Sequence, residues 1–487
     1  MFVFGRELSI LKVPIDIGDA AWFFIEKSDA PSHFGPLLIL SRPKNASKNY
    51  VSDLVARWRS YDHDIKPPFN YKLSLKPRPK WLVLPDNKID LEYHFRHAAL
   101  PAPGGEKELG ELISRLHSHR LDRSKPLWEC YLIEGLENNR FAIYLKLHHG
   151  QMDGMASVGL MQRTFSTNAR KRNMLPPWAV GLKVLPEFKP TSVEPSETKT
   201  LTKNEKDLVP RKSILSASKS LLKKSKQFSK QTSLHMAKAY SGLYPEVGAP
   251  FKAPKTMLNG RISGSRRYAT QRFALARLTK IAKAADVSLN DVFLSICGGA
   301  LRRYITEYET LPVRSLIGQV PVNIRRKSDT GMGNALAFIF VSLGTNIEDP
   351  VKRLEIVHKS TEAGKTLNKN IPPEGIQPLS MLMMGPYLSQ VVFGLAGHVP
   401  PAANLVISNI RGSNKRLYFN GAKIDQIYGP SVLFHGQALN ITMSTYVDEL
   451  NIGFTGCRKS LPSMQKIAVY TGEALTVLET AMGIVEK

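Results

Sequence analysis

A change in composition near the middle of the chain most constrains its fold. From about residue 181 to 250 the sequence is rich in Lys, Ser, Thr and Pro, whereas the flanking parts are mixed and partly apolar. A segment of that composition is typical of a linker, because it cannot bury enough apolar surface to form a core. The sequence therefore predicts two globular lobes, residues 1–180 and 251–487, joined by a basic crossover linker over residues 181–250.

The charge balance limits the partners of such a chain. There are 67 Lys and Arg against 41 Asp and Glu among 487 residues, a net charge of +26, and 43% of the residues are hydrophobic. This hydrophobic content excludes wholesale disorder. A strongly basic chain attracts nucleic acid, acidic membranes or phosphorylated small molecules, and charge alone leaves all three open.

Cysteine usage and the N-terminal sequence both indicate a cytoplasmic protein. Cys130, Cys297 and Cys457 are far apart and form no CxxC pair, which fits a reducing compartment. The N-terminal stretch has charged residues inside its apolar runs and lacks the pattern of a signal peptide.

Two segments suggest contact with lipid. Residues 375–410 contain no charged residue, but prolines divide them, so we expect a buried helix or a wall facing lipid substrate rather than a membrane span. Residues 211–230 hold seven Lys or Arg and no acid, with Ile214, Leu221 and Phe228 at seven-residue spacing. A helix there would either lie on an anionic membrane surface or pack its apolar stripe on its own protein.

Periodicity predicts a mixed α/β fold. Residues 141–147 alternate like a strand, and residues 155–165 read as the helix that follows. Ser288 is a plausible N-cap for a helix with apolar residues at helical spacing. Four further segments read as strands, the last of them a hairpin of two strands turning near Asp448 and Glu449, and a closing amphipathic helix completes the second lobe.

The segment LKLHHGQMDGMAS holds the most informative polar residues. Because side chains alternate along a strand, His149 shares the face of Phe141 and Leu147, whereas His148 points to the opposite face. We expect the apolar face to point inward, which would place His149 at the end of a buried surface, where a neutral imidazole can accept a proton. A carboxylate at Asp153 can hold the loop or an imidazole.

Other interpretations of these residues compete with a catalytic role. By pattern alone a structural histidine pair is at least as plausible as a catalytic one. Adjacent histidines point apart on a strand and no third ligand occurs at a metal-binding spacing, so no metal site is predicted. Phosphate-binding, dinucleotide-binding and serine-hydrolase motifs are each incomplete or absent.

The HHGQMDG segment matches HHxxxDG, and the chain resembles the bacterial wax ester synthase/diacylglycerol acyltransferase family of the CoA-dependent acyltransferase superfamily. Further matching motifs in the same order extend the resemblance over nearly the whole chain. These motifs are Pro126-Leu127-Trp128-Glu129, Asn290-Asp291, Pro321-Val322-Asn323-Ile324-Arg325, Gly333-Asn334, Ser408-Asn409-Ile410 and Ala438-Leu439-Asn440-Ile441.

The resemblance implies a fold and a reaction. It implies two similar chloramphenicol-acetyltransferase-like α/β lobes with an active-site tunnel between them. His149 would be the general base that takes a proton from a hydroxyl, which attacks the thioester of acyl-CoA without an acyl-enzyme. His148 would assist in the motif, and Asp153 would hold the histidine loop through an arginine, for which Arg325 is the candidate.

Further site residues follow from the same resemblance. Asn290 is the candidate oxyanion donor, although Asn290 and Asp291 could equally cap a helix. Gly154 and Asp291 are expected at the substrate site. Met381 and Met384, within the uncharged region, would line the acyl or alcohol cavity, or be ordinary core.

The sequence departs from the family pattern at two places. Gly150 stands where Ala or Ser is commoner. The family's Ser-Asn-Val-Pro-Gly-Pro reads Ser408-Asn409-Ile410-Arg411-Gly412-Ser413, which puts the substrate range in question.

The sequence thus predicts an O-acyltransferase that makes wax esters from acyl-CoA and a long-chain alcohol, with diacylglycerol as a second acceptor. No resident cofactor is expected, because acyl-CoA is a substrate. The protein would contact the inner membrane or lipid inclusions peripherally. Two competing hypotheses are a nucleic-acid-binding protein, which lacks any supporting motif, and a non-catalytic lipid-binding relative, which would be expected to have a damaged HHxxxDG.

Overall fold

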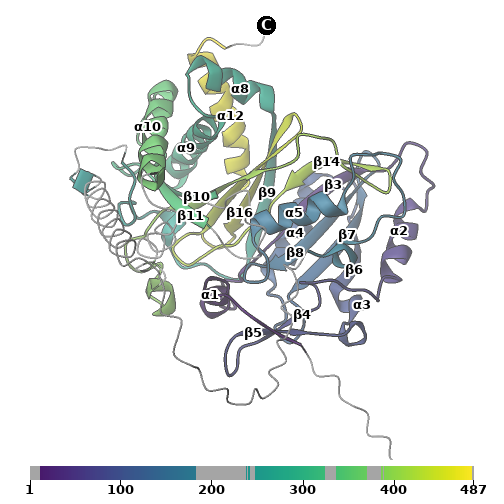
Figure 1. Ribbon diagram of the computed structural model, residues 1–487. Helices are drawn as coiled ribbons and strands as arrows, with labels where there is room; N and C mark the ends of the chain where they lie inside the picture. Colours follow the sequence, from purple (N-terminus) through teal and green to yellow (C-terminus); the bar gives the residue numbers. More distant parts are fainter. Residues whose placement is uncertain are drawn as a thin grey trace, which may run out of the picture.

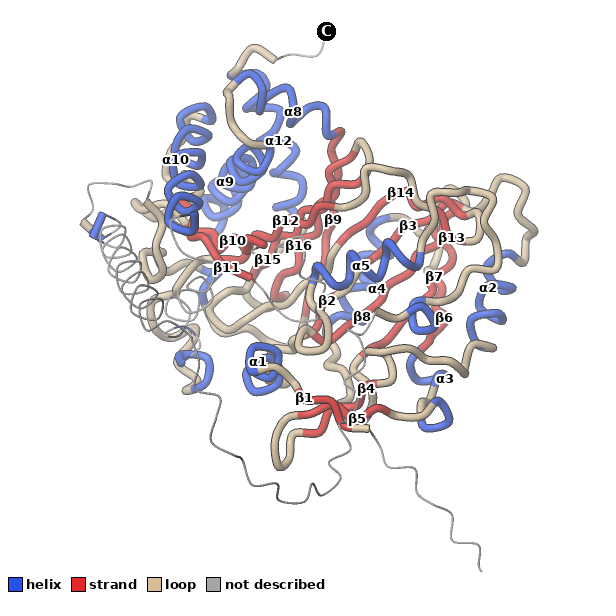
Figure 2. The backbone as a smooth tube through the Cα atoms, in the orientation of Figure 1, coloured by secondary structure: helices blue, strands red, loops and turns tan. Residues whose placement is uncertain are grey.

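The computed structural model describes residues 11–182, 247–323, 336–369 and 389–484, together with residues 237, 238, 240, 241, 385 and 387. Two α/β lobes lie side by side, each built on one large sheet (Figures 1 and 2). A small three-stranded sheet and one helix lie below them in the view of Figure 1. The predicted α/β class is confirmed.

The first lobe contains a seven-stranded sheet. Its strands in order are β13 (Tyr418–Phe419), β14 (Ala422–Tyr428), β3 (Leu37–Ser41), β8 (Arg140–His148), β7 (Trp128–Leu136) and β6 (Phe95–Ala99), with β2 (His33–Phe34) paired to β8. The helices of this half of the chain are α1 (Ile17–Ile25), α2 (Tyr50–Arg59), α3 (Leu91–His94), α4 (Glu106–Ser118), α5 (Gly154–Thr164) and α6 (Pro177–Val180), with a 3₁₀ turn at Asp86–Lys88. The small sheet is β1 (Lys12–Pro14), β5 (Lys80–Val83) and β4 (Tyr71–Ser74).

The second lobe contains a six-stranded sheet. Its strands in order are β11 (Leu336–Ser342), β10 (Ile317–Asn323), β12 (Leu405–Arg411), β15 (Leu439–Tyr446), β16 (Glu449–Cys457) and β9 (Arg266–Ala274). Its helices are α8 (Leu275–Ala284), α9 (Leu289–Tyr308), α10 (Pro350–Lys369) and α12 (Lys466–Ala481), and a 3₁₀ turn spans Met257–Asn259. The predicted hairpin exists, but it turns at Val447 and Asp448, and Glu449 already begins β16.

The core of the second lobe follows from its helix pattern. Ser288 caps α9 by accepting a hydrogen bond from the Asp291 backbone nitrogen at 3.2 Å. The apolar residues spaced along α9 are buried, as the periodicity predicts: Val292, Ile296, Ala300 and Tyr304. Burial of one such large side chain contributes roughly 1.5–3 kcal/mol, so this face holds the helix against the sheet.

The two lobes exchange structure. β13 and β14 belong by sequence to the C-terminal half, yet β14 pairs antiparallel with β3 and so completes the first lobe's sheet. At the other side, β9 is an edge strand whose Arg266 and Tyr268 nitrogens donate to the hydroxyls of Ser118 and Ser114 on α4, at 2.9 and 2.8 Å. Sheet membership therefore crosses the predicted boundary between residues 1–180 and 251–487.

No single helix in the described parts of the chain is long and apolar enough to cross a membrane. One bent pair, α8 with α9, passes the same test of length and composition, with an angle of 103° between the two helices. Within residues 375–410, residues 375–384, 386 and 388, and with them Met381 and Met384, lie outside the described residues, as does the basic segment 211–230. Both segments keep the roles predicted from the sequence only as predictions.

Candidate active site

The histidine pair lies at the C-terminal end of β8, an interior strand of the first lobe's sheet. Phe141, Ile143, Leu145 and Leu147 belong to the core beneath α2 and α5, whereas Ala142 and Tyr144 belong to the core beneath α4. The predicted alternation is thus confirmed. The second face is buried as well, because α4 covers Ala142, Tyr144 and Lys146, and His148 at the end of the strand packs against Phe23 of α1.

A buried polar layer makes that second face possible. The Lys146 ammonium donates to the backbone carbonyls of Leu116 and His119 at the end of α4 and lies 3.4 Å from a Glu129 carboxylate oxygen. Burial lowers the pKa of Lys146, and Glu129 opposes that effect. A buried charge without a partner is destabilising, so loss of either Lys146 or Glu129 would leave the other unpaired and destabilise the strand.

Helix α1 forms a wall against both histidines. The ring of His149 stacks on Trp22 with centroids 3.9 Å apart and planes inclined by 19°. The ring of His148 stacks on Phe23 at 4.6 Å and 15°. The role of α1 was not predicted from the sequence, where its one signal is an apolar run that ends in a carboxylate, Trp22-Phe23-Phe24-Ile25-Glu26.

The end of α1 supplies a buried carboxylate, Glu26. One of its oxygens accepts a hydrogen bond from the Ser32 nitrogen at 3.0 Å and lies 3.6 Å from His148 Nε2. Its other oxygen lies 2.7 Å from an Arg123 guanidinium nitrogen. Burial alone would raise the pKa of Glu26, but His148, the Ser32 nitrogen and Arg123 together lower it to about 2.

These contacts set the tautomer of His148. Its Nδ1 accepts a hydrogen bond from the Gly150 nitrogen at 3.1 Å, so that atom carries no proton. The proton of the neutral ring is then on Nε2, which faces Glu26. Burial lowers the pKa of His148 despite that carboxylate, so the ring is neutral at pH 7. His148 is therefore hydrogen-bonded to the turn at Gly150 and lies beside Glu26, 3.6 Å from its carboxylate, with no hydrogen bond to Nε2 among the described residues.

His149 lies just beyond the strand in an apolar setting. Its backbone nitrogen donates to the Ser32 carbonyl at 2.8 Å, and Phe34 approaches the ring at 5.0 Å. Burial lowers its pKa to about 3, although its own backbone carbonyl has the opposite effect. Its Nδ1 is buried and has no hydrogen-bond partner among the described residues. His149 is therefore an unprotonated imidazole that can accept a proton.

Asp153 and Gly154 begin helix α5. The Asp153 carboxylate accepts a hydrogen bond from the Ala156 nitrogen at 2.7 Å and is buried, which is the geometry of an N-cap. Its predicted role as a holder of the histidine loop stays a prediction. Arg325, the predicted partner of Asp153, lies outside the described residues.

Gly150, the residue directly after the histidine pair, is required by α1. A Cβ atom there would lie 2.8 Å from the Asp19 carbonyl oxygen and 2.7 Å from the Phe23 ring. Contacts that short do not occur without displacement of the backbone. The departure from the family's usual Ala or Ser therefore has a physical reason in this chain.

Asn290 and Asp291 are adjacent in sequence but have different environments. The Asp291 carboxylate is fully buried, closes the capping box with Ser288, and accepts hydrogen bonds from His358 at 2.9 Å and Thr361 at 2.6 Å. Burial alone would raise the pKa of Asp291, but those hydrogen bonds lower it. The Asn290 side-chain oxygen instead accepts a hydrogen bond from Asn409 at 3.2 Å. Of the two, Asn290 is the one whose side chain points to another motif.

Strand β12 links the two lobes at this site. Asn409 bonds to Asn290 at the start of α9, and the next residue, Ile410, approaches Gly154, where a Cβ atom would lie 4.0 Å from its Cδ1. The histidine loop of the first lobe and the start of α9 in the second thus both contact the end of β12. The structure brings His148, His149, Asp153 and Gly154 together in one loop, with Asn290 connected through β12.

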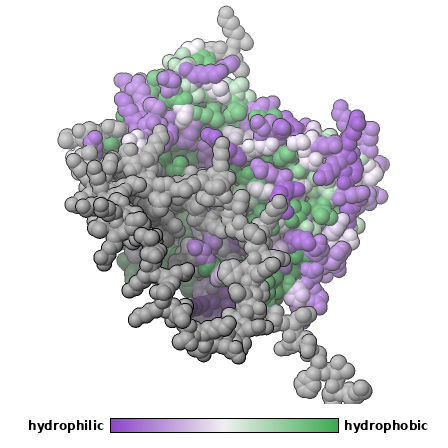
Figure 3. Space-filling model, viewed as in Figure 1, coloured by the Kyte–Doolittle hydropathy of each residue, from purple (hydrophilic) through white to green (hydrophobic). Residues whose placement is uncertain are grey.

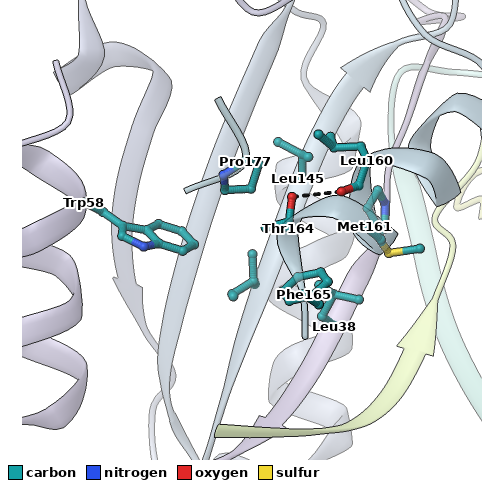
Figure 4. Close-up of a pocket in the computed structure, with 10 residues that line it drawn as sticks. Leu38, Trp58, Leu145, Leu160, Met161, Thr164, Phe165 and Pro177 are labelled. Atoms are coloured by element: carbon teal, nitrogen blue, oxygen red, sulfur yellow. Dashed lines mark hydrogen bonds between the residues drawn. The ribbon is translucent and has the colours of Figure 1, made fainter. Parts of the chain in front are cut away.

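Two hollows differ in size and position. A void of about 20 Å³ lies between α5 and the first sheet, lined by apolar residues that include Leu145, Leu160 and Met161 (Figure 4). It has room for about one water molecule and belongs to the core. A groove of about 950 Å³ lies between α4 of the first lobe and β9 with the start of α12 of the second. Its charged lining residues are Lys107, Arg115, Arg266, Arg267 and Arg458 against Glu106 and Glu111.

Within the described residues, no group of three or more His, Cys, Asp or Glu could hold a metal ion.

Comparison with known proteins identifies the family. Residues 17–293 match the wax ester synthase/diacylglycerol acyltransferase catalytic domain, and residues 332–479 match the WS/DGAT C-terminal domain. The chain is 37% identical to O-acyltransferase WSD of Acinetobacter baylyi, over 97% of this chain and 98% of that protein.

Solved structures agree with this family assignment. A wax ester synthase/diacylglycerol acyltransferase from Marinobacter aquaeolei VT8 superposes with a TM-score of 0.75 and 32% identity, covering 97% of this chain and all of that one. The first condensation domain of the calcium-dependent antibiotic synthetase shares the fold, with a TM-score of 0.55 and 15% identity over 98% of both chains. Family models and relatives cover both lobes and the site between them, and the chain therefore belongs to the wax ester synthase/diacylglycerol acyltransferase (WS/DGAT) family of acyltransferases.

Proposed function

We propose that this acyltransferase moves a long-chain acyl group from acyl-CoA to a fatty alcohol, with diacylglycerol as a second acceptor. The observation that carries the proposal is His149, an unprotonated imidazole stacked on Trp22 beside an intact HHxxxDG loop. The intact loop argues against a non-catalytic lipid-binding relative. Membership of an acyltransferase family leaves the nucleic-acid-binding hypothesis without support.

The proposed reaction is a direct transfer. His149 accepts the hydroxyl proton while the alcohol oxygen attacks the thioester carbon. The tetrahedral intermediate then collapses with cleavage of the carbon–sulfur bond, and His149 returns the proton to the leaving CoA sulfur. A base in this role typically contributes about 10²–10⁴ in rate. No acyl-enzyme forms in this sequence of steps.

Asn290 is the proposed donor to the oxyanion of that intermediate. Its side-chain oxygen is engaged by Asn409, which leaves its amide nitrogen as the donor. Such donors act best when they are fixed before the reaction, and the bond to Asn409 provides that restraint. His148 has a positioning role, because it is hydrogen-bonded to the turn at Gly150 and lies beside Glu26.

The groove between α4 and β9 is the proposed site for the phosphates of CoA. Five cationic residues line it against two acidic ones, a surplus of three positive charges. The groove also lies close behind the histidine strand, because His119 at its wall accepts a hydrogen bond from Lys146 on β8. Arginine and lysine are the usual partners of phosphate groups.

Lipid substrates also support a peripheral location. The net charge of +26 favours contact with an anionic surface, where a fatty alcohol or diacylglycerol is dissolved. We accordingly propose that the protein works at the inner membrane or at lipid inclusions.

Thiol release by purified protein given palmitoyl-CoA and hexadecanol tests the proposed activity, with the ester identified by mass spectrometry. Diacylglycerol replaces hexadecanol in a second series, and His149→Ala serves as the control for spontaneous thioester hydrolysis. Absence of any ester across a range of chain lengths for both substrates would falsify the proposal.

A further inference from the structure

A cluster of exposed apolar side chains lies on the outer side of α1, and the proposed reaction does not use it. Phe24 is 64% exposed, and three of the four residues after Val391 are also exposed: Val392 by 60%, Phe393 by 75% and Leu395 by 48%. We name these four residues the apolar patch. Single exposed apolar residues are ordinary in proteins, but several large ones close together need a reason.

Two contacts bring the parts of the apolar patch together. The Lys27 ammonium, two residues after α1, donates to the Val391 carbonyl at 3.2 Å. Ile25 packs into the same apolar cluster as Tyr387 and Val391. The end of α1 and residues 391–395 are therefore neighbours, and both lie at the lower side of the molecule in Figure 1. Elsewhere, hydrophilic side chains cover the outer edge of the first lobe at the right of Figure 3.

Cationic side chains contact the segment that carries most of the apolar patch. Three basic side chains from three different segments each donate to a backbone carbonyl of residues 391–398. These are Lys27 to Val391 at 3.2 Å, Arg261 to Gly394 at 3.2 Å and Lys255 to His398 at 3.4 Å. Asp29, whose carboxylate lies 4.0 Å from Arg261, is the acid in contact with this group. Residues 375–410 contribute no acid at all.

An apolar centre with a basic rim is the surface that binds an anionic lipid bilayer, because acyl chains accept the apolar side chains and headgroup phosphates pair with the cations. We propose that the apolar patch, with Lys27, Lys255 and Arg261, docks the protein on an anionic membrane. This inference rests on the proposed function in one respect: docking would give access to lipid acceptors, which dissolve in such a membrane.

The position of the patch gives docking a consequence for the site. Phe24 is on the outer side of α1, while Trp22 on the same helix stacks on His149. Trp22 also lies 5.9 Å from Phe434, which packs into the apolar cluster beneath residues 387–396. A membrane bound at the patch would therefore lie one helix away from the base, and a lipid alcohol would reach it by a short apolar path.

Flotation with phosphatidylcholine vesicles, with and without phosphatidylglycerol, tests the docking. The full chain should bind the vesicles that contain phosphatidylglycerol more tightly than those of phosphatidylcholine alone. The double variant Phe24→Ser with Phe393→Ser should bind them at least about tenfold more weakly, because it removes two large side chains from the bilayer interface. Val477→Ser is the matched control, since Val477 is 54% exposed on α12, at the opposite end of the molecule in Figure 1. Unchanged vesicle binding by the double variant would overturn the proposal.

A second measurement reads insertion directly. Phe393→Trp should show quenching by brominated lipid in anionic vesicles, whereas Val477→Trp should show none beyond that of the parent chain. Equal quenching of both variants contradicts the assignment of this surface. Sedimentation that shows self-association lost in the double variant, without vesicle binding, would instead assign the patch to a second copy of the chain.

The docking and the proposed activity can fail separately. The double variant should retain thiol release from a short acyl-CoA and a water-soluble alcohol, and lose at least about tenfold with hexadecanol presented in vesicles. Vesicle binding without any ester formation would reject the proposed function and keep the docking surface. Ester formation by a parent chain that does not bind vesicles would reject the docking surface and keep the proposed function.

Discussion

Trp22 stacks on His149 with ring centroids 3.9 Å apart, although 126 positions separate them along the chain. This contact covers the imidazole and excludes water from one of its faces. Burial is the main cause of its lowered pKa, and Trp22 is one of the side chains that bury the ring.

Replacement of Trp22 should therefore change the pH dependence as well as the rate. Trp22→Ala removes a stacking contact worth about 0.5–1.5 kcal/mol, so kcat/KM should fall by roughly two- to twelvefold. Water entering beside His149 should raise its pKa toward 6.5, and the acidic limb of the profile should move to higher pH. A profile that keeps the shape of the parent would contradict this role. Trp22→Phe, which retains an aromatic face, is the control.

The parent enzyme should keep its activity in mild acid. The pKa of His149 in the folded protein is lowered to about 3, so this group gains its proton only well below pH 6.5. Measurement of kcat/KM with a non-ionising alcohol should give no inflection near pH 6.5. Protein stability must be followed in parallel by circular dichroism to separate unfolding from titration.

His149→Ala should reduce kcat by roughly 10²–10⁴, the usual contribution of a general base. His148→Ala should have a smaller effect, because His148 holds the loop and does not accept the proton. Single-turnover thiol release compares the two variants. A greater loss in His148→Ala than in His149→Ala would exchange their proposed roles.

Glu26→Gln tests the buried carboxylate. The folded-state pKa of Glu26 is about 2 against an ordinary value of 4.5, so its ionisation stabilises the native protein. This contribution, on the order of 3 kcal/mol, is fully present above pH 4.5 and is lost as the pH falls toward 2. The difference in unfolding free energy between parent and variant should thus be large at pH 7 and shrink below pH 4.5.

Glu92→Gln, at an exposed position on α3, is the matched control and should show little change at either pH. An unfolding difference for Glu26→Gln that is independent of pH would show that its charge is not what matters.

Gly150→Ala should displace α1. The added methyl group would lie 2.8 Å from the Asp19 carbonyl oxygen and within 2.7 Å of Phe23, so either α1 or the histidine turn must move. Activity should fall at least about tenfold, because a shift of about 1 Å at a catalytic group has a cost of that order or more. Gly159→Ala is the control, since a Cβ atom at Gly159 on α5 meets nothing within 4 Å. That variant should be as stable as the parent or more so, by up to about 1 kcal/mol.

The groove predicts a change in substrate affinity. Arg267→Glu together with Arg458→Glu should raise KM for acyl-CoA by about tenfold or more and leave kcat nearly unchanged, because both residues line the groove and have no role in the proposed proton transfer. Lys280→Glu together with Lys283→Glu, two exposed residues on α8, makes the same change in net charge elsewhere. Equal KM values for the groove variant and the control would reject the groove as the phosphate site.

Local pattern was sufficient for several elements. Alternating residues predict β8 and helical spacing predicts α9, because each depends on neighbours within a few positions. Ser288 and Asp153 both accept backbone hydrogen bonds at the starts of their helices, as side-chain chemistry alone suggests. The HHxxxDG motif and the further motifs that follow it in order also predict the family from the sequence.

Other features depend on contacts between distant parts of the chain. The burial of both faces of β8 needs α4, and the ionised state of Glu26 needs Arg123 and His148. Pairing of β14 with β3 joins residues nearly 400 positions apart, which a prediction from separate lobes does not anticipate.

The amino-acid sequence by itself determined the two-part organisation, the principal strands and helices, and the identity of the histidine loop, since these follow from composition, periodicity and a short motif. Only the tertiary structure decided the environment of that loop. It placed Trp22, Phe23 and Glu26 against the histidines and the Asn409–Asn290 bond beside them. The physical reason is that the pKa values and ring orientations of the histidines depend on burial and on charges a few ångströms away. Those neighbours come from segments whose separation in sequence carries no information about their distance in space.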